Sequence, residues 1–121
     1  VMFVSEKVHK PLAWGMPFVV FGCQNTLTHM KNIGFKTFEP YIDESYDKLE
    51  DPSERYESAL ASLKDFVTEE YPRDEINKIT EYNLRFYYSD KLYIQLVETF
   101  LNEIINTYLN KREQVDFNFN Q

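Results

Sequence analysis

Cysteine, glycine and cationic side chains are scarce in this 121-residue chain, and each shortage argues against a class of protein. The lone cysteine, Cys23, leaves no intrachain disulfide and no cysteine-based metal site, and it favours a reducing compartment. Thirteen Lys and Arg face twenty Asp and Glu, and the net charge of −7 argues against a general nucleic-acid-backbone binder. The sequence also has no phosphate-binding loop of the glycine-lysine-serine type.

Long apolar runs are absent as well. No run approaches the roughly 20 residues of a membrane-spanning helix, so we expect no membrane span. The opening stretch is too short for a signal peptide. The chain begins at Val1 on a strand-like run, and three predicted short strands are few for an independent parallel sheet, so we expect it to be a carboxyl-terminal portion of a larger protein.

The residues that are present favour a folded domain, because 43% are hydrophobic and 17% are aromatic. We expect a single α/β domain over residues 1–113 and a flexible tail over 114–121. Three short strands are predicted at residues 1–4, 16–21 and 35–38. The clearest is Met16–Phe21, a continuous apolar run typical of a central parallel strand.

Helices are predicted between and after these strands. A helix near Val8 ending at Gly15, and another from Asn25 or Thr26 to Gly34, complete a parallel β-α-β-α-β unit over residues 1–38. An acidic loop follows at 39–51. Asp51-Pro52-Ser53-Glu54 then opens the first of three helices within 52–111. Its expected apolar stripe is Tyr56, Ala59, Leu60, Leu63, Phe66 and Val67.

The other two helices are expected at about 73–88 and from a Ser89 cap to about Lys111. The last carries the longest apolar stripe in the chain: Tyr93, Leu96, Val97, Phe100, Leu101, Ile104, Ile105 and Tyr108. Such a stripe is usually core, but the short sheet leaves open that it needs a partner chain or self-association.

Candidate ligand-binding residues lie where two predicted strands end and helices begin. Ligands bind at the carboxyl ends of parallel strands, and helix N-termini attract anions. The sequence therefore places a site at Ser5, Glu6, Lys7, Gly22, Asn25 and Thr26. The alternative is ordinary helix capping and turn chemistry.

The acidic loop offers a second candidate. Clustered carboxylates suit a hard cation, and the loop holds Asp43, Glu44, Asp47, Glu50 and Asp51. Their spacing matches no EF-hand, and acidic residues also favour the approach to a helix N-terminus. We therefore predict no metal and no cofactor, and no catalytic residue is assigned.

A family resemblance gives these patterns a function. Ser5-Glu6-Lys7, Lys10-Pro11 and Pro17-Phe18-Val19-Val20 with Gly22 resemble the donor-binding, carboxyl-terminal half of GT-B glycosyltransferases, nearest the α1,3-fucosyltransferase-like group. The wider pattern, with Gly34–Phe38 and Asp43–Asp47, is similar to uncharacterised proteins of bacteriophages and marine viruses. The resemblance implies a partial Rossmann-like fold.

The same resemblance implies a role for two residues, with Glu6 at the ribose and Lys7 at the diphosphate of a nucleotide-sugar. It points to the host cytoplasm or the virion as the location. Because the acceptor half is absent, we expect a nucleotide-sugar-binding part of a glycosyltransferase-like protein that is incomplete for catalysis. The alternative is a noncatalytic structural or protein-interaction module.

Overall fold

The computed structural model describes residues 6–119, and it describes the side chains of residues 8–115. The chain divides into two compact units, Val1–Tyr88 and Ser89–Gln121. The described part contains α-helices, one short 3-10 helix and no β-strand. In chain order the elements are α1 (Glu6–Trp14), α2 (Thr26–Ile33), η1 (Ser45–Lys48), α3 (Pro52–Thr68), α4 (Arg73–Tyr87) and α5 (Asp90–Phe119).

The predicted α/β fold with a three-stranded parallel sheet is therefore wrong, and so are its Rossmann-like and GT-B assignments. The first predicted strand, residues 1–4, lies outside the described residues. Residues 16–21 and 35–38 are described and form no strand. Of the apolar run Met16–Phe21, only Phe18 is buried, and Met16 and Phe21 are half exposed, so this segment is not covered on two faces.

In residues 16–21 and 35–38, backbone groups hydrogen-bond to side chains and not to a neighbouring strand. Asn83 of α4 accepts the Lys36 N–H at 2.9 Å and donates to the Lys36 carbonyl at 2.8 Å. Glu44 accepts the N–H of Phe38, and the Tyr46 hydroxyl accepts the N–H of Val20. Backbone N–H and C=O groups that would pair with a neighbouring strand in a sheet thus hydrogen-bond to individual side chains.

The helix boundaries predicted at Asp51, Ser89 and Gly34 are confirmed. Asp51 accepts the Ser53 N–H at 2.9 Å, and Pro52 opens α3. Gly34 ends α2 with φ +129°, and a Cβ there would lie 2.7 Å from the Phe86 ring. The Ser89 hydroxyl accepts the Leu92 N–H at the start of α5. That helix continues to Phe119, beyond the predicted end at Lys111.

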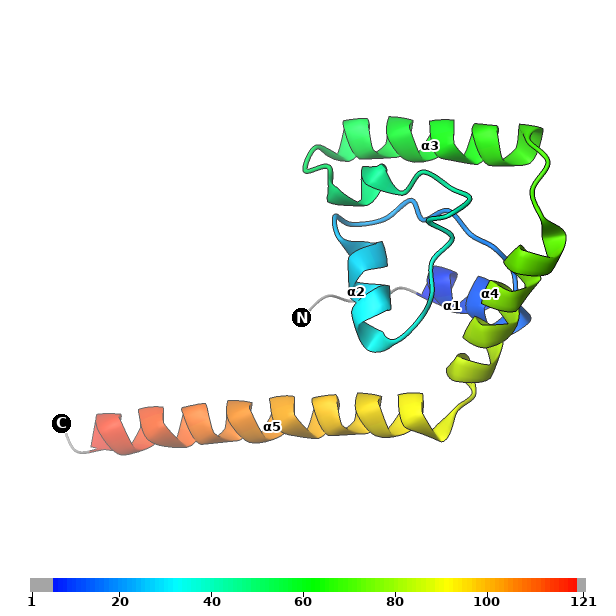
Figure 1. The fold of residues 1–121 in the computed structure, drawn as a ribbon. Coiled ribbons are helices and arrows are strands. Elements are labelled where there is room, and N and C mark those ends of the chain that lie inside the picture. Colours follow the sequence, from blue (N-terminus) through cyan, green and yellow to red (C-terminus); the bar gives the residue numbers. More distant parts are fainter. Residues whose placement is uncertain (1–5, 120–121) are drawn as a thin grey trace. The chain divides into compact units, whose positions relative to one another are not determined.

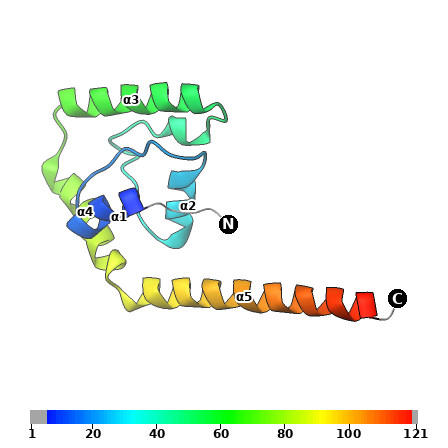
Figure 2. The ribbon, with the colours of Figure 1, turned by 180° about the vertical axis from the view of Figure 1, so that it is seen from behind.

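Aromatic pairs join the elements of the first unit. Phe18 meets Phe38 edge-to-face with ring centroids 5.2 Å apart, and Phe35 meets Phe86 of α4 at 4.8 Å. Helix α1 packs against α4, and η1 contacts both α2 and α3. In Figure 1 and in the reverse view of Figure 2, η1 lies between α2 and α3. The core is therefore built around irregular segments enclosed by helices.

Candidate functional site

Of the six predicted ligand-binding residues, the structure describes the side-chain environment of three. Ser5 lies outside the described residues, and Glu6 and Lys7 begin α1 with side chains that are also outside the description. Gly22, Asn25 and Thr26 lie together at the approach to α2. The nucleotide-sugar role of all six stays a prediction.

The three described residues make contacts within the chain. The Gly22 carbonyl accepts the Nε–H of buried Arg55 at 2.8 Å, and the same guanidinium donates to the carbonyls of Leu49 and Glu50. Asn25 has φ 64°, and its side chain makes no capping hydrogen bond. The Thr26 hydroxyl donates to the Cys23 carbonyl at 2.7 Å. These contacts hold the turn that leads into α2.

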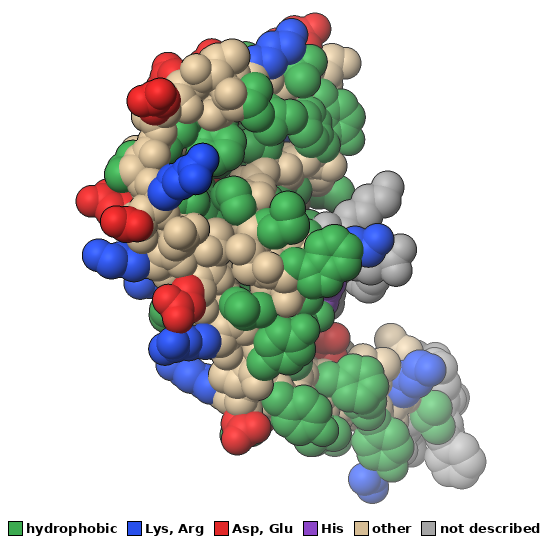
Figure 3. All heavy atoms as spheres, turned by 90° about the vertical axis from the view of Figure 1, so that its right-hand side faces the viewer, with side chains coloured by type: hydrophobic (Ala, Val, Ile, Leu, Met, Phe, Trp, Pro, Cys, Tyr) green, Lys and Arg blue, Asp and Glu red, His purple; other side chains and the backbone are tan. Residues whose placement is uncertain are grey.

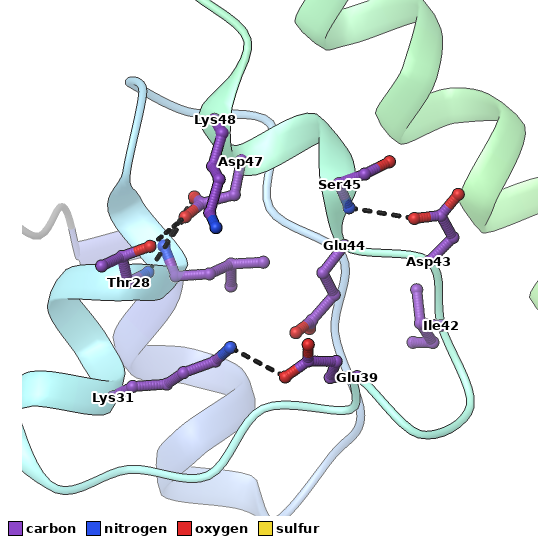
Figure 4. A pocket seen from close by; sticks show the side chains of 10 residues that line it. Thr28, Lys31, Glu39, Ile42, Asp43, Glu44, Ser45, Asp47 and Lys48 are labelled. Carbon is purple, nitrogen blue, oxygen red and sulfur yellow. Dashed lines mark hydrogen bonds and ion pairs between the residues drawn. The ribbon is translucent and has the colours of Figure 1, made fainter.

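Asp47 caps α2 from a distant part of the sequence. Its Oδ1 accepts the Leu27 N–H at 2.8 Å, and its Oδ2 accepts the N–H and hydroxyl of Thr28 at 3.0 and 2.8 Å (Figure 4). The backbone carbonyl of Asp47 also accepts the Asn25 N–H at 2.7 Å. A negative side chain therefore occupies the helix N-terminus where the sequence predicted an anionic ligand. Sequence reasoning missed this cap because it spans about twenty residues.

A pocket of about 350 Å³ lies beside this cap. It is lined by α2 and the acidic loop, and its rim carries an ion pair between Lys31 Nζ and Glu39 Oε2 at 3.0 Å. Figure 4 shows the Glu44 carboxylate reaching into the same space, toward Lys31 and Glu39. Among the described residues, Glu44 Oε1 has no hydrogen-bond partner, whereas Oε2 accepts the Phe38 N–H at 3.2 Å.

Burial raises the pKa of the Glu44 carboxyl above its ordinary value. Hydrogen bonding from Thr37 and Phe38, and the positive charge of Lys31, act in the opposite direction without cancelling the rise. The neighbouring Asp43 behaves differently, because its hydrogen bond from the Ser45 N–H lowers its pKa. No group of three or more His, Cys, Asp or Glu side chains within the described residues is placed to hold a metal ion.

The carboxylates of the acidic loop thus hydrogen-bond backbone N–H groups, which the composition of the loop did not predict. Asp43, Asp47 and Asp51 each accept backbone N–H groups, and Glu44 is 9% exposed. Asp43, Glu50 and Asp51 are exposed, as a solvated approach to a helix requires, whereas Glu44 and Asp47 are buried. Within the described part of the chain, Glu44 Oε1 is a buried side-chain atom without a hydrogen-bond partner, and such a group marks an unusual environment.

Most of the exposed large apolar side chains among the described residues lie on α5, a 30-residue helix drawn from yellow to red in Figure 1. Leu92 is buried, but eleven other large apolar side chains of α5 are 37% to 70% exposed: Tyr93, Ile94, Leu96, Val97, Phe100, Leu101, Ile104, Ile105, Tyr108, Leu109 and Val115. Hydrophobic side chains are visible on the surface of both units in Figure 3. On the first unit they are fewer and belong to several elements.

The apolar residues of α5 occupy one broad side of the helix. Polar residues recur at the same helical spacing on the opposite side: Gln95, Thr99, Asn102, Asn106, Asn110 and Glu113. None of the described helices is both long and apolar enough to cross a membrane. An amphipathic helix with its apolar side exposed is a common form of protein-binding element.

Comparison with protein-family models, curated proteins and solved structures gave no match to this chain.

Proposed function

We propose that this protein is a noncatalytic protein-interaction module whose binding surface is the apolar side of α5. The observation that carries the proposal is the exposure of eleven large apolar side chains on that one helix. Folded chains rarely leave contiguous apolar patches of more than a few hundred Å² uncovered, and larger ones mark interaction sites. Covering the patch removes apolar surface from water, which favours association.

The nucleotide-sugar role has less support from the same structure. It depended on strand ends at the edge of a parallel sheet, and the described residues contain no sheet. At α2, the N–H groups of Leu27 and Thr28 already donate to Asp47. An interaction module needs neither feature, because its binding energy comes from apolar area.

A charge placed on the apolar side tests the proposal. Leu101→Glu/Ile104→Glu puts two carboxylates at the centre of the exposed stripe. The matched control, Asn102→Glu/Asn106→Glu, puts the same two charges on the polar side of the same turns. Each full-length variant is compared with the wild type by sedimentation velocity, binding of a hydrophobic dye and urea unfolding.

We expect Leu101→Glu/Ile104→Glu to abolish association, and to bind less dye than the wild type at concentrations too low for the wild type to associate, whereas the control matches the wild type in both. The free energy of unfolding of the monomer is expected to change by less than about 0.5 kcal/mol, as for surface substitutions. The proposal fails if the Leu101→Glu/Ile104→Glu variant loses about 3 kcal/mol or more at every protein concentration. These positions would then be part of the core of a monomer.

A further inference from the structure

The exposed apolar side of α5 has the spacing of a coiled coil. Positions alternating by three and four residues are Ile94, Val97, Leu101, Ile104, Tyr108, Lys111 and Val115. All but Lys111 are apolar, and those six side chains are 37% to 64% exposed. A repeat of 3.5 residues keeps such a seam against a partner helix along its whole length.

The surface of α5 also has a shallow hollow that corresponds to the hole into which a coiled-coil partner inserts a side chain. Ile104, Thr107, Tyr108 and Lys111 line it together with Phe100 and Glu103. The first four are spaced i, i+3, i+4 and i+7, which is the arrangement that receives one side chain of a facing helix. A second α5 supplies apolar side chains at the matching spacing.

The exposed area is sufficient for a stable pair of chains. Aromatic side chains such as Tyr93, Phe100 and Tyr108 offer roughly 150–250 Å² each and aliphatic ones somewhat less, so the eleven side chains, about half exposed, amount to on the order of 1,000 Å² per chain at most. A standard protein interface buries about 800 Å² per partner. A second copy of α5 therefore covers the seam and the flanking side chains of Tyr93, Phe100 and Ile105, and it leaves Leu96 and Leu109 on the outer side of the pair.

The charges favour one orientation of the two helices. In a parallel, in-register pair, Lys111 faces Lys111 inside the seam, and like charges in that position repel. In an antiparallel pair with Leu101 beside Ile104 of the second copy, Lys111 lies beside Ile94. Asp90 and Glu98 of the second copy are each one turn from Ile94, so Lys111 meets opposite charge. In the antiparallel pair the dipoles of the two helices point in opposite directions, which also favours this arrangement.

We propose that two copies of this chain pair through α5 as an antiparallel coiled coil, with Leu101 and Ile104 at its centre. This inference rests on the proposed function and identifies the partner as a second copy.

Cysteine cross-linking of the full chain tests the direction. In a Cys23→Ser background, Ile94→Cys and Lys111→Cys are prepared as two separate proteins. Each is oxidised alone and in an equal mixture, and the products are separated under non-reducing conditions. Antiparallel pairing brings position 94 against position 111 of the other copy, so only the mixture is expected to form a covalent dimer.

Sedimentation velocity provides the second measurement. The wild type is expected to sediment as a dimer, and Leu101→Glu/Ile104→Glu to weaken dimerisation at least about 100-fold, while Asn102→Glu/Asn106→Glu stays within about threefold. Disulfides formed by Ile94→Cys alone would overturn the antiparallel pairing and leave the proposed function intact. A monomeric wild type whose stability is unchanged by Leu101→Glu/Ile104→Glu would overturn self-pairing alone. A large, concentration-independent loss of stability in that variant would overturn both.

Discussion

At the scale of single residues, the acidic side chains of the loop are used mainly to satisfy backbone N–H groups. Asp51 caps the helix that it precedes, and a capping pattern of four adjacent residues predicts this contact. Asp47 caps α2, which lies earlier in the sequence and is brought beside it only by the fold. Local patterns therefore identify one kind of cap and not the other.

Replacing Asp47 should destabilise the first unit. Asp47→Asn keeps the shape of the side chain but turns one acceptor into a donor that faces the N–H groups of Leu27 and Thr28. We expect a loss of about 1–2 kcal/mol in the free energy of unfolding, measured with urea. Asp65→Asn, at an exposed position of α3, is the matched control. Equal stability of the two variants would contradict the capping role.

Glu44 should make stability depend on pH. Its pKa is raised in the folded protein, so the folded chain binds more protons than the unfolded chain between the ordinary Glu pKa and the raised one. This contribution to stability is full below the ordinary pKa and is lost as the pH rises through the raised one. In Glu44→Gln the titration is removed, so the variant should become more stable relative to wild type as the pH rises.

Urea unfolding from about pH 4 to about pH 8 measures this difference. Glu50→Gln, at an exposed position of the same loop, is the matched control. Parallel pH profiles for wild type and Glu44→Gln would show that burial of Glu44 does not govern its titration.

At the scale of elements, helices were predictable and strands were not. A helix satisfies most of its backbone internally, so residues such as Gly34, Asp51 and Pro52 mark its ends without reference to the rest of the fold. A strand needs a neighbour, and the apolar run Met16–Phe21 does not reveal whether it has one. The face of a helix is also hard to predict: α3 buries Arg55, Ala59 and Ser62, whereas Tyr56, Leu60 and Val67 are exposed.

Asn83 is the residue that holds one strand-like segment in place. Its amide is 2% exposed and hydrogen-bonds both backbone groups of Lys36. Asn83→Ala leaves those groups without their partner, and we expect a loss of about 2–3 kcal/mol in the free energy of unfolding. Asn77→Ala, at an exposed position of the same helix, controls for the change in helix propensity. A similar loss in both variants would contradict the role of the Lys36 contacts.

At the scale of the whole molecule, the two units differ in what covers their apolar side chains. Phe38, Leu27 and Met30 of the first unit are at most 1% exposed, whereas the stripe of α5 is open. The sequence already indicated that this stripe either forms core or needs a partner. The sequence did not decide between these two alternatives, because periodicity shows that a helix has an apolar side but not which residues or chain pack against that side.

Dilution should therefore weaken α5. A helix draws most of its stability from packing of its apolar side, and for α5 we propose that a second chain provides this packing. We expect the helical circular dichroism signal to decrease at high dilution, because residues 90–119 lose part of their helical structure when the chains separate. The signal of Leu101→Glu/Ile104→Glu should be low and independent of concentration. A wild-type signal that stays constant through dimer dissociation would contradict this coupling.

The contacts of the acidic loop also restrict how the length of the chain varies in evolution. Glu44 reaches back to Phe38, Asp47 to α2, and Arg55 joins Gly22 to the end of the loop. An insertion or deletion within residues 39–51 would change the separation between these anchor points and break several contacts together. Homologous sequences should therefore keep this loop at constant length even where its exposed residues vary.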